Sequence, residues 1–275
     1  MKEEYPNVIY KYRYLDDEGH ILDMIKKGEI WLSSARNFND PFDTAITHRF
    51  DELYDNKIAE DWARAVVKRE MPYLTPDEIE KCVSKKLTEI RNNPDDYIEK
   101  AKERIIEIQY NKFGICSFSE SNNNILLWSH YARNHTGVCI GFDTEVIINY
   151  ANQIAEKEKE LLDLVKVKYS NEYPKFSLFK SALNKDDLTD IFNLLYTKSS
   201  DWSYEKEYRL IYWEKTNFGI QLGSKAISEV ILGCCITPEH RENILEICSS
   251  LDNSPSVYQA NKSHKEFSIE LEKIL

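Results

Sequence analysis

Short segments rich in β-branched and aromatic residues recur along the chain between helical segments of unequal length. Residues 8–14 and 30–33 have strand character, and residues 18–27 between them have apolar side chains at helical spacing. Near the end, two strand-like segments, 256–260 and 267–271, follow each other directly. Adjacent strands favour a mixed or antiparallel sheet over a doubly wound parallel one. The order therefore predicts an α+β fold.

The remaining pattern extends this prediction. Strands are expected at 115–118, 138–142, 165–169, 208–213 and 229–232. Helices are expected at 124–132, 145–164, 186–196 and 238–249.

A charged, helical segment interrupts the alternation between residues 51 and 110. Thr75, Pro76 and Glu78 form a capping box with proline at the first helical position, and Pro94 opens another helix. Because no Gly/Ser-rich or Pro-rich linker borders the segment, we expect one domain over residues 1–275, with 51–110 as a helical insertion or lid.

Charge and hydropathy limit the classes of partner. The sequence has 36 Lys+Arg against 47 Asp+Glu, a net charge of -11, which opposes long-range attraction to nucleic acids and anionic membranes but leaves a local basic groove open. Apolar runs long enough to span a bilayer are absent, and residues 1–5 are too polar for a secretory signal. We expect a cytoplasmic protein without a membrane partner; the oligomeric state is left open.

The cysteine and histidine spacing predicts no metal site. The six cysteines include no CxxC pair, and four of them are expected to be small core residues: Cys116, Cys139, Cys234 and Cys235. His130 and His135 are five residues apart, which places them on different faces of a helix. The motifs GxGxxG, GxxxxGK[ST], GxSxG and HExxH are also absent.

Two charged strands are the candidate site. Alternation through residues 202–212 places Glu205, Glu207 and Arg209 on one side of a strand. They are either a solvated sheet face or a set of groups that holds a sugar and stabilises positive charge at its anomeric carbon.

In the opening strand, Lys11 and Arg13 alternate with tyrosines. This pattern indicates either an edge strand protected by charge or a pyrophosphate contact. The segment from Asn37 to Asp43 reads as a rigid turn or a ligand wall packed by Phe38 and Phe42.

Several blocks together resemble a known family. They are Tyr10 to Arg13, Phe38 to Asp43, Cys116 to Glu120 with Trp128 to Tyr131, Gly137 to Asp143, and Trp202 to Arg209. Their order and spacing resemble the bacterial family catalogued as domain of unknown function 2971, over nearly the whole chain except the helical insertion. That family name supplies no activity.

A second resemblance, at the level of architecture, is to the mono-ADP-ribosyltransferase fold. It rests on a first strand with Tyr and Arg, a helix ending in Lys26-Lys27-Gly28, a strand with Ser33-Ser34, and a late strand with Glu205 and Glu207. The resemblance implies that NAD lies in a cleft between two small sheets. Glu207 would stabilise the oxocarbenium-like state, and Glu205 would orient the acceptor.

The other roles follow from the same resemblance. NAD would contact Lys11, Tyr12, Arg13, Asn39, Asp40 and Arg209, with Tyr12 or a neighbouring ring stacking on nicotinamide and Arg13 at the pyrophosphate. The walls for substrate would be Phe38, Trp128, Tyr131 and Trp202. The first strand offers two competing cations, Lys11 and Arg13, where the fold uses one His or Arg.

Three functions are therefore open. The first is an ADP-ribosyltransferase acting on a protein or nucleic acid, as a toxin or phage-defence effector. The second is a hydrolase or nuclease that uses His130 with Glu120 or Asp40 as acid and base. The third is a non-catalytic module whose aromatic blocks form a recognition groove. All three expect the blocks to converge on one site.

Overall fold

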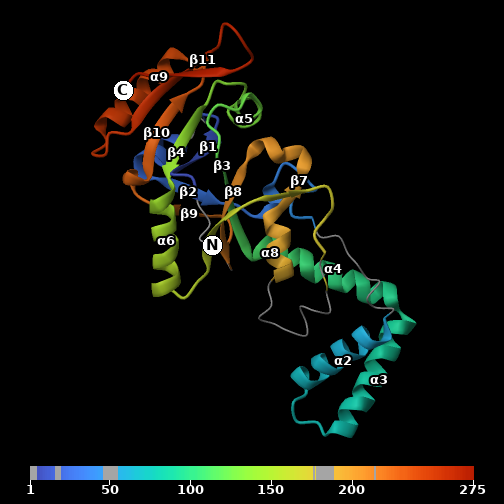
Figure 1. Ribbon diagram of the computed structural model, residues 1–275. Coiled ribbons are helices and arrows are strands. Elements are labelled where there is room, and N and C mark those ends of the chain that lie inside the picture. Colours follow the sequence, from blue (N-terminus) through green and yellow to red (C-terminus); the bar gives the residue numbers. More distant parts are fainter. Residues whose placement is uncertain (1–4, 16–19, 46–54, 176, 178–188, 214) are drawn as a thin grey trace. The chain divides into compact units, whose positions relative to one another are not determined.

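The computed structural model describes residues 5–15, 20–45, 55–175, 177, 189–213 and 215–275 (Figure 1). The chain divides into two compact units. The first comprises Met1–Asn37, Asn111–Val167 and Asp201–Leu275, and the second comprises Phe38–Tyr110 and Lys168–Ser200. Residues 51–110, expected to be an insertion within a single domain, fall almost entirely in the second unit; the single-domain assignment stays a prediction.

An eight-stranded mixed sheet forms the centre of the first unit, which confirms the α+β class. In spatial order its strands are β12 (Ile269–Lys273), β11 (Ser256–Lys262), β10 (Ile227–Leu232), β4 (Val138–Asp143), β1 (Val8–Arg13), β3 (Phe113–Ser119), β8 (Glu207–Trp213) and β5 (Leu162–Lys166). Only the β10–β11 pair in this sheet is parallel. Because β1 lies between β4 and β3, the edge-strand reading of its lysine and arginine is wrong.

In the described part of the first unit, the sheet is accompanied by four α-helices, three 3-10 turns and a strand pair. The helices are α1 (His20–Lys27), α5 (Ile125–Tyr131), α6 (Thr144–Lys157) and α9 (Pro238–Ser250). The 3-10 turns are η1 (Ala35–Asn37), η3 (Ser200–Glu205) and η4 (Ser224–Ala226), and β2 (Glu29–Leu32) pairs antiparallel with β9 (Phe218–Gln221). The side chains of Asn124, Asp143 and Thr237 accept backbone N–H bonds at the starts of α5, α6 and α9.

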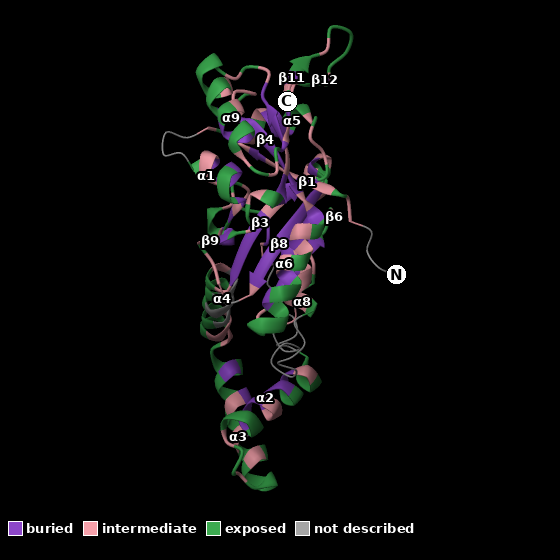
Figure 2. Cartoon of the chain, turned by 90° about the vertical axis from the view of Figure 1, so that its left-hand side faces the viewer, coloured by how far each residue is buried: buried purple, intermediate pink, exposed green. Residues whose placement is uncertain are grey.

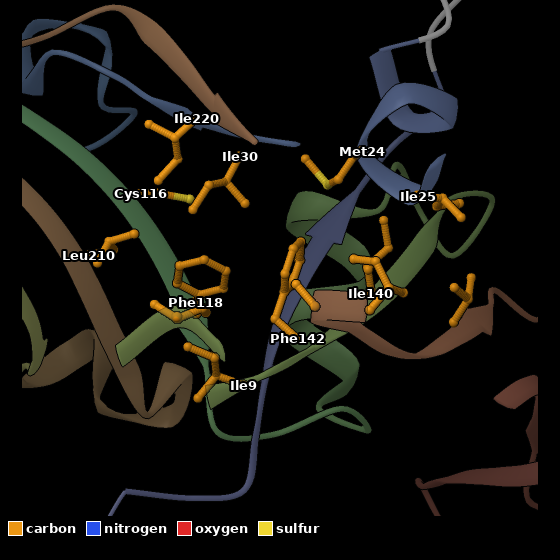
Figure 3. Close-up of a cluster of buried hydrophobic side chains, with 14 of the residues drawn as sticks. Ile9, Met24, Ile25, Ile30, Cys116, Phe118, Ile140, Phe142, Leu210 and Ile220 are labelled. Carbon is orange, nitrogen blue, oxygen red and sulfur yellow. The ribbon is translucent and has the colours of Figure 1, made fainter. Parts of the chain in front are cut away.

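One face of the large sheet packs into the main apolar core (Figure 3). Ile9, Phe118, Phe142 and Leu210 come from four different strands of the sheet, and each is at most 3% exposed. The rings of Phe118 and Phe142 meet edge to face with centroids 5.5 Å apart. In Figure 2 the central strands β3 and β8 are accordingly buried along most of their length. Burial on both faces lets these strands carry the site described below.

The end of α1 is tied to the end of β9 by two glycines. Gly28 follows α1 with φ +59°, as expected for a glycine that stops a helix. Its carbonyl oxygen accepts a bond from Leu222 N at 3.1 Å, and Gly223 N donates to Lys27 O at 2.9 Å. A Cβ on Gly28 would lie 2.2 Å from Gly223 O, whereas a Cβ on Gly223 would meet nothing.

Helices dominate the second unit. Its elements are α2 (Asn56–Glu70), α3 (Pro76–Asn92), most of α4 (Pro94–Asn111), α8 (Thr189–Tyr196), and the parallel pair β6 (Lys168–Ser170) and β7 (Thr197–Ser199). Trp62, Val66 and Leu87 belong to the separate apolar core of this unit. The predicted capping box of Thr75 and Glu78 is confirmed. The helix pair of α2 and α3 therefore has an apolar core of its own.

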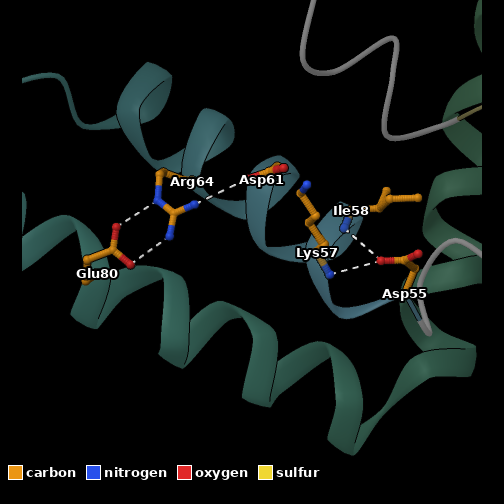
Figure 4. A network of polar contacts seen from close by, with 6 residues as sticks. All are labelled: Asp55, Lys57, Ile58, Asp61, Arg64 and Glu80. Carbon is orange, nitrogen blue, oxygen red and sulfur yellow. Dashed lines mark hydrogen bonds and ion pairs between the residues drawn. The ribbon is translucent and has the colours of Figure 1, made fainter.

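Polar contacts on the surface of α2 and α3 align the two helices (Figure 4). Arg64 donates from Nε and Nη2 to the two carboxylate oxygens of Glu80 at 2.7 and 2.9 Å, and from Nη1 to Asp61 at 3.4 Å. Asp55 caps α2 by accepting from the backbone N–H groups of Lys57 and Ile58. Exposed pairs of this kind contribute at most about 1 kcal/mol each, so they set helix register more than stability.

Two sequence predictions of secondary structure differ from the structure. The helix expected over 145–164 ends at Lys157, and the chain then reverses through Lys159, with φ +59°, into β5. The alternation of Leu162 and Leu164 fits a strand that pairs with β8. The strand β9 was not expected. Residues 18–19, 51–54 and 186–188, assigned to helical segments, lie outside the described residues. Among the described helices, none is long and apolar enough to cross a membrane.

The two glycines allow a matched test of the α1–β9 connection. Replacing Gly28 by alanine should destabilise the fold by about 2 kcal/mol or more, because it combines a left-handed backbone with a clash against Gly223 O. Gly223→Ala meets only the backbone penalty, of order 1 kcal/mol. Urea unfolding of both variants measures the difference. Equal losses would mean that the close approach at Gly28 is unimportant.

Candidate functional site

A buried ion pair lies on β8. Arg209 is 0% exposed and Glu207 2%. The guanidinium donates from Nε to Glu207 Oε1 at 2.7 Å and from Nη2 to Oε2 at 3.2 Å. The two residues share a strand face, as the alternation predicts, and the bidentate geometry compensates for the loss of water around both charges. Since both are buried, the reading of this strand as a solvated sheet face is wrong.

Glu205 joins this pair by a different route from the one predicted. Residues 200–205 form the 3-10 turn η3, and Lys206, with φ +45°, breaks the chain before β8 begins. The predicted strand therefore starts too early, because the polar residues Ser200, Asp201 and Ser203 favour local turns. As a result, Tyr204 and Tyr208 pack in different apolar clusters.

The Glu205 carboxylate is nevertheless buried at 4% exposure and held in place. Tyr131 OH donates to its Oε1 at 2.7 Å. Ser119 Oγ donates to the Glu205 carbonyl oxygen at 2.6 Å. The two carboxylates of Glu205 and Glu207 are thus fixed by partners on α5 and β8, and the Glu205 backbone is fixed by Ser119 on β3. The helix α5 exists locally because Asn124 caps it and Leu127 and Trp128 anchor it.

Two cross-strand rows define the face that carries these groups. The first row runs from β10 to β8 through Glu229, Gly141, Tyr10, Ser119 and Glu207. The second contains Ile231, Cys139 and Tyr12 on one side, and Ser117, Arg209 and Val165 on the other. Directly paired residues share a face, so both rows lie opposite the main core. Sequence reasoning missed Glu229, because pairing with Gly141 shows no local signal.

The second row is interrupted where β1 separates from β3. Only Tyr10 pairs with β3, at Ser119, and further along the edge of β3 Ser33 exchanges two backbone bonds with Ile115 at 3.0 and 2.8 Å. Between them the Ser117 carbonyl oxygen accepts a bond from Lys11 Nζ at 2.6 Å. An ammonium therefore takes the place of a backbone amide at this opening of the sheet.

Lys11 is a half-buried cation whose protonation is perturbed. Burial lowers the pKa of Lys11 below its ordinary value of 10.5, and the charge of Arg13 lowers it further, whereas the Glu207 carboxylate acts to raise it. The alkyl chain leaves β1 on the core side, with Nζ 5.8 Å from the centroid of Phe118. The strand alternation thus places Lys11 and Glu207 on opposite faces of the sheet. Across the opening between β1 and β3, the negative charge of Glu207 still acts on the Lys11 ammonium.

The aromatic residues of this face divide into buried and accessible rings. Tyr12 is 6% exposed, donates from its OH to Ser121 O at 2.8 Å and meets Trp128 edge to face at 5.3 Å. Trp128 is fully buried, and its Nε1–H donates to Asn122 O at 2.9 Å. Tyr131 and Trp202 are half-buried. The rings of Tyr131 and Trp202 are therefore partly accessible, as are those of Tyr10 and Tyr204.

His130 lies at the exposed rim of α5. Its ring is 6.3 Å from that of Tyr131 and 6.5 Å from that of Trp202. Within the described residues it makes no hydrogen bond or ion pair, and Glu120 pairs instead with Lys166 at 3.3 Å. Acid and base pairs require hydrogen-bond reach, so this geometry does not support the pair of His130 and Glu120.

Phe38, Asn39 and Asp40 belong to the second unit, where they form the predicted turn. Asp40 Oδ1 accepts from Phe42 N at 2.9 Å, and Asp40 O accepts from Asp43 N at 3.2 Å. Asp43, in turn, lies 3.6 Å from Lys198 in a buried ion pair. Lys198 carried no sequence signal. The convergence of these residues with β1 and β8 stays a prediction.

Metal ligands do not gather in the described parts of the chain, where no group of three or more His, Cys, Asp or Glu side chains is suited to hold an ion. All six cysteines are free thiols. Cys116 and Cys139 are buried, as predicted, whereas the prediction is wrong for Cys235, which is exposed, and Cys234 is only half-buried.

Comparison with known proteins identifies one family. The family described as protein of unknown function (DUF2971) matches residues 127–210, which include most of α5, all of β4 and the start of β8. This part of the chain is similar to the DUF2971 family. The matched segment contains Tyr131, Glu205, Glu207 and Arg209, whereas Lys11 and Phe38 to Asp43 lie outside it. No curated protein and no solved structure matches the chain.

The perturbed lysine gives a pH-dependent test of the opening in the sheet. Between its lowered folded pKa and the ordinary value of 10.5, the unfolded chain binds more protons at Lys11 than the folded chain does. The stability of the native sequence should therefore rise relative to Lys11→Met as the pH increases toward 10.5. Urea unfolding of both proteins over this range measures it. The unpaired Ser117 carbonyl adds a pH-independent offset, so parallel profiles would contradict the assignment.

Proposed function

We propose that this protein is an ADP-ribosyltransferase-like enzyme that uses NAD as substrate. The observation that carries the proposal is the pair of buried carboxylates, Glu205 and Glu207, each fixed by a separate partner beside the opening between β1 and β3. Transfer of ADP-ribose passes through a positively charged, oxocarbenium-like sugar, which a fixed carboxylate in a site of low polarity stabilises strongly.

The proposed roles follow from the geometry of the first unit. In the reaction the bond between nicotinamide and ribose C1′ breaks, and its electron pair leaves with nicotinamide. Glu207 stabilises the cation, with Arg209 holding the carboxylate in position. Glu205, oriented by Tyr131 OH, takes the proton of the acceptor as the acceptor attacks C1′.

The cations of β1 suit the other end of NAD. Lys11 lies in the opening, and Arg13 is half-buried on the same strand, where their charges favour a pyrophosphate. The nicotinamide ring would stack on Tyr131 or Trp202, whose rings are partly accessible, in preference to the buried ring of Tyr12. The roles in NAD binding expected for Phe38, Asn39 and Asp40, which belong to the second unit, stay predictions.

The proposal includes the cellular setting. The acceptor would be a protein or a nucleic acid, and the enzyme would work in the cytoplasm as a toxin or phage-defence effector. A net charge of -11 means that a nucleic-acid acceptor would be recognised through a local groove, without attraction by the whole protein. The exposed His130, without a carboxylate partner among the described residues, favours this enzyme class over the hydrolase alternative.

Nicotinamide release measures the proposed activity directly. Incubation of the purified protein with NAD and candidate acceptors should release nicotinamide, and Glu207→Gln should lower the rate about 100-fold or more, because it removes the charge and keeps the size of the side chain. Glu246→Gln, on the exposed surface of α9, is the matched control and should leave the rate unchanged.

Folding of the variant is checked by its circular dichroism and by calorimetric binding of NAD, which Glu207→Gln should retain. Equal rates in the native protein and a folded Glu207→Gln variant would refute the catalytic role. Absence of both NAD binding and nicotinamide release in the native protein would refute the enzyme class.

A further inference from the structure

Two adjacent cysteines lie in the turn that joins β10 to α9. The sulfur atoms of Cys234 and Cys235 are 3.8 Å apart. Cys235 is exposed and Cys234 is half-buried against the aromatic cluster of the sheet. No other two cysteine side chains interact within the described residues. The turn therefore presents two thiols to solvent as a pair.

The backbone of this turn is fixed on both sides. Cys235 N donates to His135 O at 3.0 Å, and Gly233 N donates to Gly137 O at 2.9 Å. A Cβ on Gly233 would lie 2.1 Å from His135 O, so only glycine fits there. The two sulfurs are consequently held close without a bond between them.

Their separation is unfavourable for a disulfide and suited to a bridging atom. A disulfide requires sulfurs about 2 Å apart and Cα atoms about 4.4–6.8 Å apart, whereas adjacent Cα atoms are only about 3.8 Å apart. Two sulfurs bonded to one atom through bonds of about 2.3 Å lie about 3.8 Å apart at a tetrahedral angle and somewhat closer at the smaller angles of pyramidal arsenic(III). The observed distance of 3.8 Å is therefore within reach of a single bridging atom after a small side-chain adjustment.

We propose that Cys234 and Cys235 form a dithiol site that binds one thiophilic atom with two positions open to sulfur. Trivalent arsenic in an organic arsenical is the simplest ligand of this class. With an arsine oxide, two As–S bonds form, the As–O bond breaks, and both thiol protons leave with the oxygen as one water. Arsenic and sulfur keep their oxidation states, so the step needs no oxidant.

The surroundings support entry through Cys235. Burial and the neighbouring thiol raise the pKa of Cys234, while the positive charge of Lys262 opposes this shift. The exposed Cys235 therefore meets the reagent first, and Cys234 closes the chelate. Closure within one turn gives the second thiol a high effective concentration, which isolated thiols such as Cys82 lack. The site is independent of the proposed ADP-ribosyltransferase activity.

Phenylarsine oxide tests the site on the intact folded chain. Mass spectrometry under native conditions should show one phenylarsenic group per chain, with loss of one water. The adduct should survive excess 2-mercaptoethanol and be removed by 2,3-dimercaptopropanol. Either Cys234→Ser or Cys235→Ser should weaken binding at least about 100-fold, and Cys82→Ser should leave it unchanged.

Other results would overturn the proposal. Absence of an adduct on the native chain, or an adduct that 2-mercaptoethanol removes, would show that the two sulfurs do not chelate. Unchanged binding in the Cys235→Ser variant would place the arsenic elsewhere. This variant is decisive even if Cys234→Ser lowers the melting temperature, because Cys235 is exposed and its replacement leaves the apolar cluster intact.

Discussion

The ion pair of Glu207 and Arg209 constrains everything around it. Taking a carboxylate and a guanidinium out of water costs several kcal/mol for each ion, and only close geometry offsets this. The pair achieves it with bonds of 2.7 and 3.2 Å on a single strand. Losing either partner would leave a buried charge, at about 3–5 kcal/mol. The neighbours of Arg209 in the sheet, Ser117 and Val165, are accordingly small enough to leave room for the guanidinium.

This constraint divides the sheet into two unlike faces. One face carries branched and aromatic side chains such as Ile9 and Phe142 and forms the main core. The other carries tyrosines, serines and buried carboxylates, covered by α5. Burial of apolar side chains stabilises one face of this sheet, and hydrogen-bonded polar groups stabilise the other. Lys11 links the two faces: its side chain leaves β1 on the core side, and its ammonium lies at the opening between β1 and β3.

The sequence predicts the fold class and most elements, because periodicity and capping are local properties. The capping box at Thr75 and the strand β10 are examples. It fails where tertiary contacts decide the outcome. The aromatic block before Lys206 has strand propensity, yet the chain forms a 3-10 turn there. Likewise, β5 forms a strand because its residues pair with β8, which is a tertiary contact.

The candidate site shows the same limit. Glu205, Glu207 and Arg209 are visible in the sequence because they are close neighbours on one segment. Their partners Ser119 and Tyr131, the contact of Lys11 with Ser117, and the position of Glu229 depend on pairing between strands distant in sequence. The ion pair of Lys198 and Asp43 joins residues that are far apart in the sequence, so no local pattern predicts it.

The central position of β1 also sets an order of assembly. Strand β1 pairs with β4 and β3, which follow it by about one hundred residues or more, and β8 must then close the other side of β3. Until those strands have been synthesised, β1 has no partner in the sheet, so its aromatic side chains stay exposed. Folding that depends on such distant pairings is slow. Until the middle of the chain has been synthesised, the exposed apolar residues can associate with other chains and aggregate.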